Sequence, residues 1–118
     1  MNVQEILEDA DLLVPNAFTE SQKIRWLNQV QTQIYNDIKT EAMEPPAPIT
    51  EDYPEFIPWL PEEYHELLSF GVAKRTAERT KDYKTAGELE LRYQNLLLVV
   101  KQRTAPKMKK VQRIKHWH

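Results

Sequence analysis

The sequence predicts an all-α fold, a small bundle of about four helices, from three observations. Its 118 residues include only two glycines, which leaves few positions for tight β-hairpin turns or phosphate-binding loops. Apolar residues recur at alternating spacings of three and four, the period of an amphipathic helix. Six of the eight prolines fall within residues 44–61, and this cluster divides the helical pattern into two parts.

Two helices are expected before the proline cluster. Asn2 and Glu5 have the spacing of a capping box that opens the first helix. We expect that helix to end near Asp11, because Pro15 disfavours helical backbone at Val14. A second helix is expected from a cap at Thr19 to about Ala42. The predicted buried positions are Val3, Ile6, Leu7 and Ala10 in the first helix, and Ile24, Leu27, Gln31, Ile34 and Ile38 in the second.

Two further helices are expected after the cluster. Pro61 suits the first position of a third helix, because its missing N–H has no helical partner there. A break near residues 81–83 separates this helix from a fourth, which Pro106 ends. Gly71 would allow a close approach between helices. The predicted buried positions are Tyr64, Leu67, Leu68, Gly71 and Val72, and then Ala86, Leu89, Tyr93, Leu96 and Val100.

The sequence therefore divides into a helical domain, residues 1–104, and a C-terminal arm, residues 105–118. Within the domain, residues 44–61 form a proline-rich insert in which aromatic residues alternate with prolines and acids. Helix is excluded for most of this stretch. We predict an extended segment that lies on the helices.

Charge is strongly sorted along the chain. Residues 1–66 contain fourteen acidic and three basic side chains, whereas residues 67–118 contain four acidic and thirteen basic ones. The net charge of −2 conceals this separation. Such asymmetry predicts binding through charged surfaces, either to an acidic partner or to another copy of the chain.

No pattern of catalytic residues is present. The chain has no cysteine, and it contains neither a phosphate-binding loop nor a nucleophile elbow. Glu62 and His65 have the spacing of one half of a dimetal carboxylate site, but no second copy exists, so we expect a surface histidine among glutamates. We therefore predict no enzyme, no cofactor and no metal site. No apolar run is long enough to span a membrane, and the N-terminus lacks signal-peptide character.

The C-terminal arm is the remaining candidate site, because it is both basic and apolar. One possible partner is nucleic acid, bound through phosphate neutralisation. A protein partner with acidic grooves fits better, because the acidic half of the chain would repel a nucleic-acid backbone. The predicted contact residues are Lys107, Lys109, Lys110, Val111, Arg113, Ile114, Lys115 and Trp117.

Two blocks of sequence resemble a known family. The first is Leu12-Leu13-Val14-Pro15-Asn16-Ala17-Phe18, followed by Gln22-Lys23 and Trp26-Leu27-Asn28. The second is Leu60-Pro61, with Tyr64 and Leu67 after it. Both blocks are similar to those of small head–tail connector proteins of tailed bacteriophages, also called adaptor or head completion proteins.

The resemblance implies a structural virion protein of the phage neck, assembled in the cytoplasm of a bacterial host. Sister copies would form a ring, a dodecamer on a twelve-fold portal, that joins the portal protein to a downstream neck or tail protein. The ring would extend the channel through which DNA passes without specific recognition, and the arm would reach the portal. The alternative is a small helical nucleic-acid-binding or DNA-packaging accessory protein that acts through the arm. For contacts between subunits, the expected residues are Trp26, Tyr35, Arg75, Arg79, Glu51 and Asp52.

Overall fold

The computed structural model describes residues 1–38, 45–50 and 64–104, and in these residues it contains four α-helices and no strand. The all-α prediction is confirmed. The helices are α1 (Val3–Leu13), α2 (Glu20–Ile38), α3 (Glu66–Arg79) and α4 (Tyr83–Thr104). None of them is long and apolar enough to cross a membrane.

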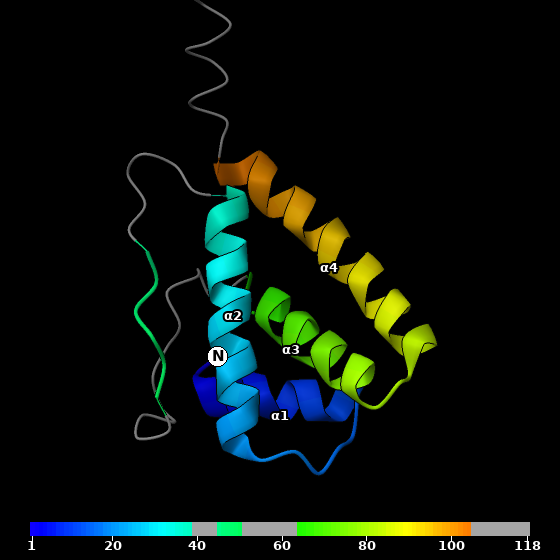
Figure 1. Cartoon of the computed structure of the whole chain (residues 1–118). Coiled ribbons are helices and arrows are strands. Elements are labelled where there is room, and N and C mark those ends of the chain that lie inside the picture. Colours follow the sequence, from blue (N-terminus) through cyan, green and yellow to red (C-terminus); the bar gives the residue numbers. More distant parts are fainter. Residues whose placement is uncertain (39–44, 51–63, 105–118) are drawn as a thin grey trace, which may run out of the picture.

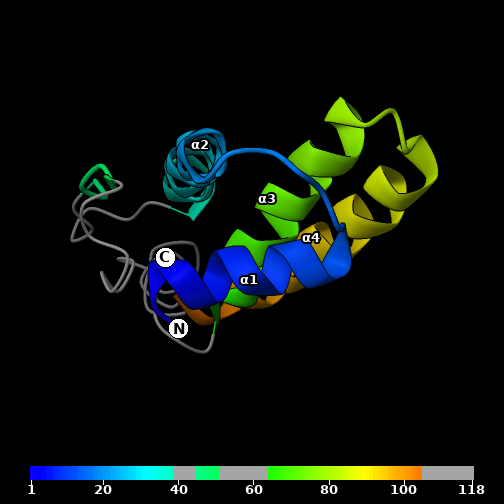
Figure 2. The same ribbon diagram turned by 90° about the horizontal axis from the view of Figure 1, so that it is seen from below.

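Helix α3 is the centre of the fold and packs against each of the other three helices. Figure 1 shows α2 on one side of α3 and α4 on the other, while α1 lies crosswise at the end where α2 begins. In the view from below, α2 is seen end-on and α1 runs across the molecule (Figure 2). Only one side of α4 is therefore used by this arrangement, and its opposite side faces outward.

The N-terminal helix has the predicted cap but is slightly longer than expected. The Asn2 side chain accepts a hydrogen bond from the Glu5 N–H, and the Glu5 carboxylate accepts one from the Asn2 N–H, which completes the capping box. The helix ends at Leu13 rather than near Asp11, because the Val14 N–H still bonds to the helical carbonyl four residues before it. Val14 itself is extended, as expected of a residue before proline.

Helix α3 begins at Glu66, after a turn formed by Tyr64 and His65, and residues 61–63 lie outside the described residues. The prediction of a surface histidine is wrong, because His65 is fully buried. Its Nδ1 lies 2.9 Å from the Met1 amino nitrogen, and this polar contact allows a histidine to be buried at the start of α3.

The predicted buried positions are confirmed in α1, α2 and α3, and corrected at one position in α4. Leu97 is buried there, whereas Leu96 is only half-buried. The prediction alternated spacings of three and four residues, which corresponds to a period of 3.5 residues. A straight helix has 3.6 residues per turn, so along α4 the buried side moves from position 96 to position 97. The break between α3 and α4 is confirmed at Lys81, whose φ of 63° is left-handed.

Gly71 sets the distance between α2 and α3. A Cβ atom at this position would lie 2.6 Å from one γ-methyl group of Val30 and 2.8 Å from the other. Val30 is buried, and its β-branched side chain is too stiff to turn both γ-methyl groups away from an added Cβ. The backbone of α3 can approach α2 this closely only because residue 71 has no side chain.

The two glycines provide a matched test of this close approach. We expect Gly71→Ala to lower the free energy of unfolding by about 1–3 kcal/mol, because overpacking outweighs the gain in helix propensity. Gly87 in α4 is exposed, with no neighbouring atom within 4 Å of an added Cβ, so Gly87→Ala should raise the same quantity by about 0.5–1 kcal/mol. Urea unfolding of both variants measures the difference. Equal effects at the two positions would contradict the role given to Gly71.

Candidate interaction groove between α2 and α3

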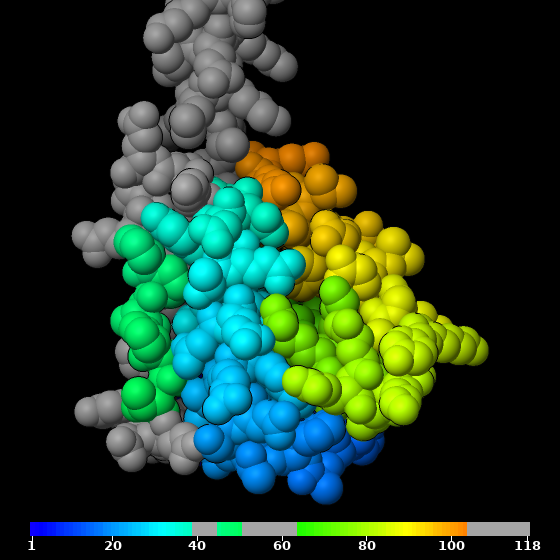
Figure 3. Space-filling view, viewed as in Figure 1, coloured from blue at the N-terminus to red at the C-terminus, as the bar shows by residue number. Residues whose placement is uncertain are grey.

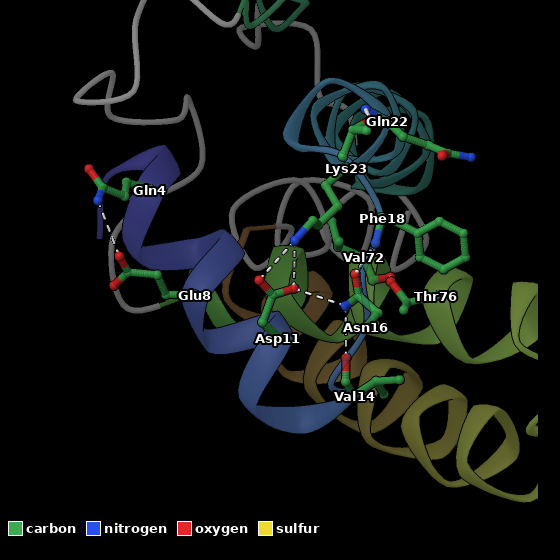
Figure 4. Close-up of polar contacts among 11 residues, drawn as sticks. Gln4, Glu8, Asp11, Val14, Asn16, Phe18, Gln22, Lys23, Val72 and Thr76 are labelled. Carbon is green, nitrogen blue, oxygen red and sulfur yellow. Dashed lines mark hydrogen bonds and ion pairs between the residues drawn. The ribbon is translucent and has the colours of Figure 1, made fainter.

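The connection between α1 and α2 is held by a polar cluster around Asp11 (Figure 4). The Lys23 ammonium donates to both oxygens of the Asp11 carboxylate, at 2.9 and 3.1 Å, although Lys23 is 9% exposed. The Asn16 amide donates to Asp11 and to the Val14 carbonyl, and its oxygen accepts from the Phe18 N–H. The short turn is therefore fixed by side chains at both of its ends.

Two further residues of the first sequence block position α2. The Phe18 ring packs edge-on against Trp26, with 5.2 Å between centroids, and Trp26 is buried beneath it. The Asn28 amide makes a pair of hydrogen bonds to the backbone of Ile49, at 2.8 Å to its carbonyl and 2.7 Å from its N–H. In this way Asn28 attaches the described part of the proline-rich insert, residues 45–50, to the outer side of α2.

Helices α2 and α3, together with Glu90 and Tyr93 of α4, line a groove that is rich in arginine. It consists of two hollows, of about 310 and 190 Å³, which share Arg75 and Glu78. Figure 3 shows the face of the molecule on which α2 and α3 meet. We call it the α2–α3 groove; its lining comprises Gln22, Arg25, Trp26, Gln29, Val30, Gln33, Gly71, Lys74, Arg75, Glu78, Arg79, Glu90 and Tyr93. Four of these side chains are basic and two are acidic, so the groove has a positive balance.

Arg75 lies where the two hollows meet. Its guanidinium donates to the side-chain oxygens of Gln29, at 3.0 Å, and Gln33, at 3.3 Å. These partners orient the guanidinium across the groove but carry no charge, so they do not neutralise it. The neighbouring Lys74 is instead paired with Glu90 of α4 at 2.7 Å.

The smaller hollow, which we call the inner hollow, is lined by two groups with shifted pKa values, Glu90 and Tyr93. Burial opposes ionisation of Glu90, but hydrogen bonds from Lys74 and Gln94, together with the charge of Lys74, hold its pKa below the ordinary value. Burial, reinforced by the negative charges of Asp37 and Glu90, raises the pKa of the Tyr93 hydroxyl despite the nearby Arg75. This hydroxyl has no hydrogen-bond partner among the described residues.

The structure brings together three of the predicted interface residues and separates the others. Trp26, Arg75 and Arg79 all line the α2–α3 groove. Tyr35 is half-buried and is not among the groove residues. Glu51 and Asp52 lie outside the described residues, as does the whole arm from Lys107 to Trp117.

Sequence reasoning missed the polar side chains of α2 that complete this groove. Gln22, Arg25 and Gln29 are spaced three and four apart, which places them on one face of the helix beside Trp26. This spacing indicates a polar side of α2, but it does not indicate a groove, because a polar side of a helix more commonly faces solvent.

The acidic side chains of α1 form a second charged surface, away from the groove. Glu5 and Glu8 are exposed and Asp9 is half-exposed, and their spacing places all three on the outer side of the helix. Figure 4 shows Glu8 pointing away from α2 and from the Asp11 cluster. We call these three residues the α1 acidic face.

Comparison with protein-family models, with curated proteins and with solved structures found no match. Among residues 1–38, 45–50 and 64–104, no three side chains of the metal-ligating types cluster together. Function is therefore inferred from the charged surfaces and from the residues of the two sequence blocks.

Tyr93 provides a test of the inner hollow. A buried hydroxyl without a partner is destabilising, so Tyr93→Phe should raise the free energy of unfolding by about 1 kcal/mol at neutral pH. Because folding raises the pKa of this group, the wild-type chain should also lose stability as the pH rises above about 10, and the variant should lose less. Urea unfolding at pH 7 and pH 10.5 measures both effects. Tyr83→Phe, at an exposed tyrosine, is the control and should change little.

Proposed function

We propose that this chain is a structural subunit of a bacteriophage neck, which forms a ring between the capsid portal and the next neck or tail protein. Sister copies would associate head-to-tail, and the DNA channel would continue through the ring. The arm, residues 105–118, would contact the portal. This protein would have no catalytic role.

The observation that carries the proposal is the placement of opposite charges on two different surfaces of one domain. The α2–α3 groove is positive, while the α1 acidic face is negative and lies elsewhere on the molecule. Two unlike, complementary surfaces favour heterologous association, in which each copy uses one surface toward each neighbour. Such contacts produce a ring when the rotation between copies closes.

The shapes of the two surfaces also suit each other. Helix α1 presents a convex row of carboxylates, and the groove is a concave strip that contains Arg25, Arg75 and Arg79. Guanidinium groups bind carboxylates in paired hydrogen bonds, and Arg75 is already oriented across the strip by Gln29 and Gln33. We therefore propose that the groove of one copy receives the α1 acidic face of the next.

The residues that resemble the connector family support a structural role. In the first block, Lys23 fixes the turn after α1, Trp26 packs on Phe18 and Asn28 holds Ile49. In the second, Tyr64 and Leu67 belong to the core. All of these side chains position helices, which fits a protein whose function is to present surfaces.

A charge exchange tests the head-to-tail contact. We expect Arg75→Glu/Arg79→Glu to prevent ring formation, because an acidic groove repels the α1 acidic face. Glu8→Lys/Asp9→Lys should prevent it as well, and it leaves the capping box of Asn2 and Glu5 intact. An equal mixture of the two variants should form rings again, since every contact in an alternating ring then joins opposite charges. Native mass spectrometry on a candidate portal ring measures the assembly.

Two results would contradict this contact: rings formed by either variant alone, or no ring in the mixture when the wild-type chain assembles. Circular dichroism of each variant is the control for folding. Lys84→Glu, at an exposed position of α4 outside both surfaces, is the matched control and should assemble normally.

The role of the arm has its own test. We expect the chain cut after Thr104, and the full chain with Lys109, Lys110 and Arg113 changed to Glu, to lose loading onto the portal ring while retaining helicity. Native mass spectrometry and circular dichroism measure the two properties. Unchanged loading by either variant would contradict portal binding by the arm. Tight binding of the full chain to DNA that weakens steeply between 50 and about 200 mM salt would favour the nucleic-acid alternative instead.

A further inference from the structure

Helix α4 has an outward-facing seam that the other three described helices leave unpartnered. The seam residues are spaced three and four apart, as along one side of a coiled-coil helix, and all of them are exposed. Leu91 is 64% exposed and Leu98 is 56% exposed, with Asn95 between them. We call this the α4 seam; it consists of Glu88, Leu91, Asn95, Leu98 and Gln102.

The part of α4 that carries Leu98 is more apolar than an ordinary solvent-facing stretch of helix. Leu96, Leu97, Leu98, Val99 and Val100 are consecutive, so this part of α4 is apolar all round. The domain core buries only the side that contains Leu97 and Val100. A helix that is apolar all round is normally covered on every side, but Leu98 and Val99 are exposed here, and so is Leu91 two turns before Leu98.

We propose that the α4 seam is a two-fold interface, on which α4 of a second copy of this chain packs antiparallel. A two-fold axis that crosses the seam near Asn95 reverses one helix onto the other. Leu91 then lies opposite Leu98 of the second copy, and Leu98 opposite its Leu91. The seam is self-complementary, because its two leucines lie on either side of the axis and its polar residues lie at the ends and at the centre.

The charges distinguish the antiparallel arrangement from a parallel one. A parallel pair would place Glu88 of one copy against Glu88 of the other, and like charges directly opposed are destabilising. In the antiparallel pair, Glu88 lies near Gln102 of the other copy instead, where an amide can donate to its carboxylate. Asn95 lies beside its symmetry mate, and two amides can exchange hydrogen bonds there.

This interface is independent of the head-to-tail contact proposed above. It uses neither the α2–α3 groove nor the α1 acidic face, and its two-fold symmetry closes after two copies instead of forming a ring. A free dimer would therefore exist whether or not the chain assembles on a portal. Loss of portal loading and loss of this dimer are separate measurements.

The first experiment is analytical ultracentrifugation of the full chain over a concentration series. We expect a monomer–dimer equilibrium, and we expect Leu98→Glu to raise the dimer dissociation constant by about 100-fold or more, since each dimer buries this side chain twice. Leu12→Glu is the matched control, because Leu12 is an exposed leucine of α1 outside the seam, and it should leave the constant unchanged. A wild-type chain that remains monomeric, or a dimer that persists in Leu98→Glu, would overturn the proposal.

The second experiment determines the direction of packing. The chain has no cysteine, so an introduced thiol has no competitor within the molecule. A mixture of Leu91→Cys and Leu98→Cys chains should form the mixed disulfide much faster than either chain pairs with itself. Faster pairing of each variant with itself would show a parallel helix pair and overturn the antiparallel one. If deletion of residues 105–118 removes the dimer while Leu98→Glu does not, the arm and not the α4 seam is the contact.

Discussion

The close approach of α3 to α2 at Gly71 is the constraint on which the rest of the structure depends. It brings the backbone of α3 against Val30, and the side chains on either side of this contact then face each other across a narrow strip. Arg75 can reach both Gln29 and Gln33 because the two helices are so near. A larger residue at position 71 would widen the groove and separate the guanidinium from its partners. The absence of a Cβ atom at residue 71 therefore determines both the packing of α3 on α2 and the width of the charged groove.

Polar side chains connect the helices at points where apolar packing alone would leave their relative position loosely defined. The pair of Asp11 and Lys23 joins α1 to α2, and the pair of Lys74 and Glu90 joins α3 to α4. Both pairs are partly buried. Their hydrogen bonds are directional, so they restrict the orientation of one helix relative to the other more than contacts between methyl groups do. In the proposed ring, such pairs would keep each subunit rigid, because a ring closes only if every copy presents its two surfaces at the same angle.

Much of the fold follows from sequence periodicity, and little of the candidate site does. The capping box at Asn2, the buried positions of α1 to α3 and the break at Lys81 depend on local rules, which a sequence displays directly. His65 was misjudged because its glutamate neighbours suggested solvent, whereas its burial depends on the distant N-terminus of α1. In α4 the buried residue is Leu97 and not the predicted Leu96, because the buried side of a straight helix does not keep a 3.5-residue period. The groove required knowledge of which face of α2 meets α3, and spacing within one helix does not contain that information.

Arg75 has one more consequence, which arises from the neutrality of its two glutamine partners. An arginine held by carboxylates contributes little field beyond its own pair, whereas this one is held by two uncharged amides. Its potential extends into solvent over roughly one Debye length, about 8 Å at physiological ionic strength. Such a field acts before contact, by steering the diffusional encounter of an acidic surface, so it governs the rate of association more than the final affinity. If the proposed ring forms through the α2–α3 groove, its assembly would therefore be faster at low salt concentration than at high salt concentration.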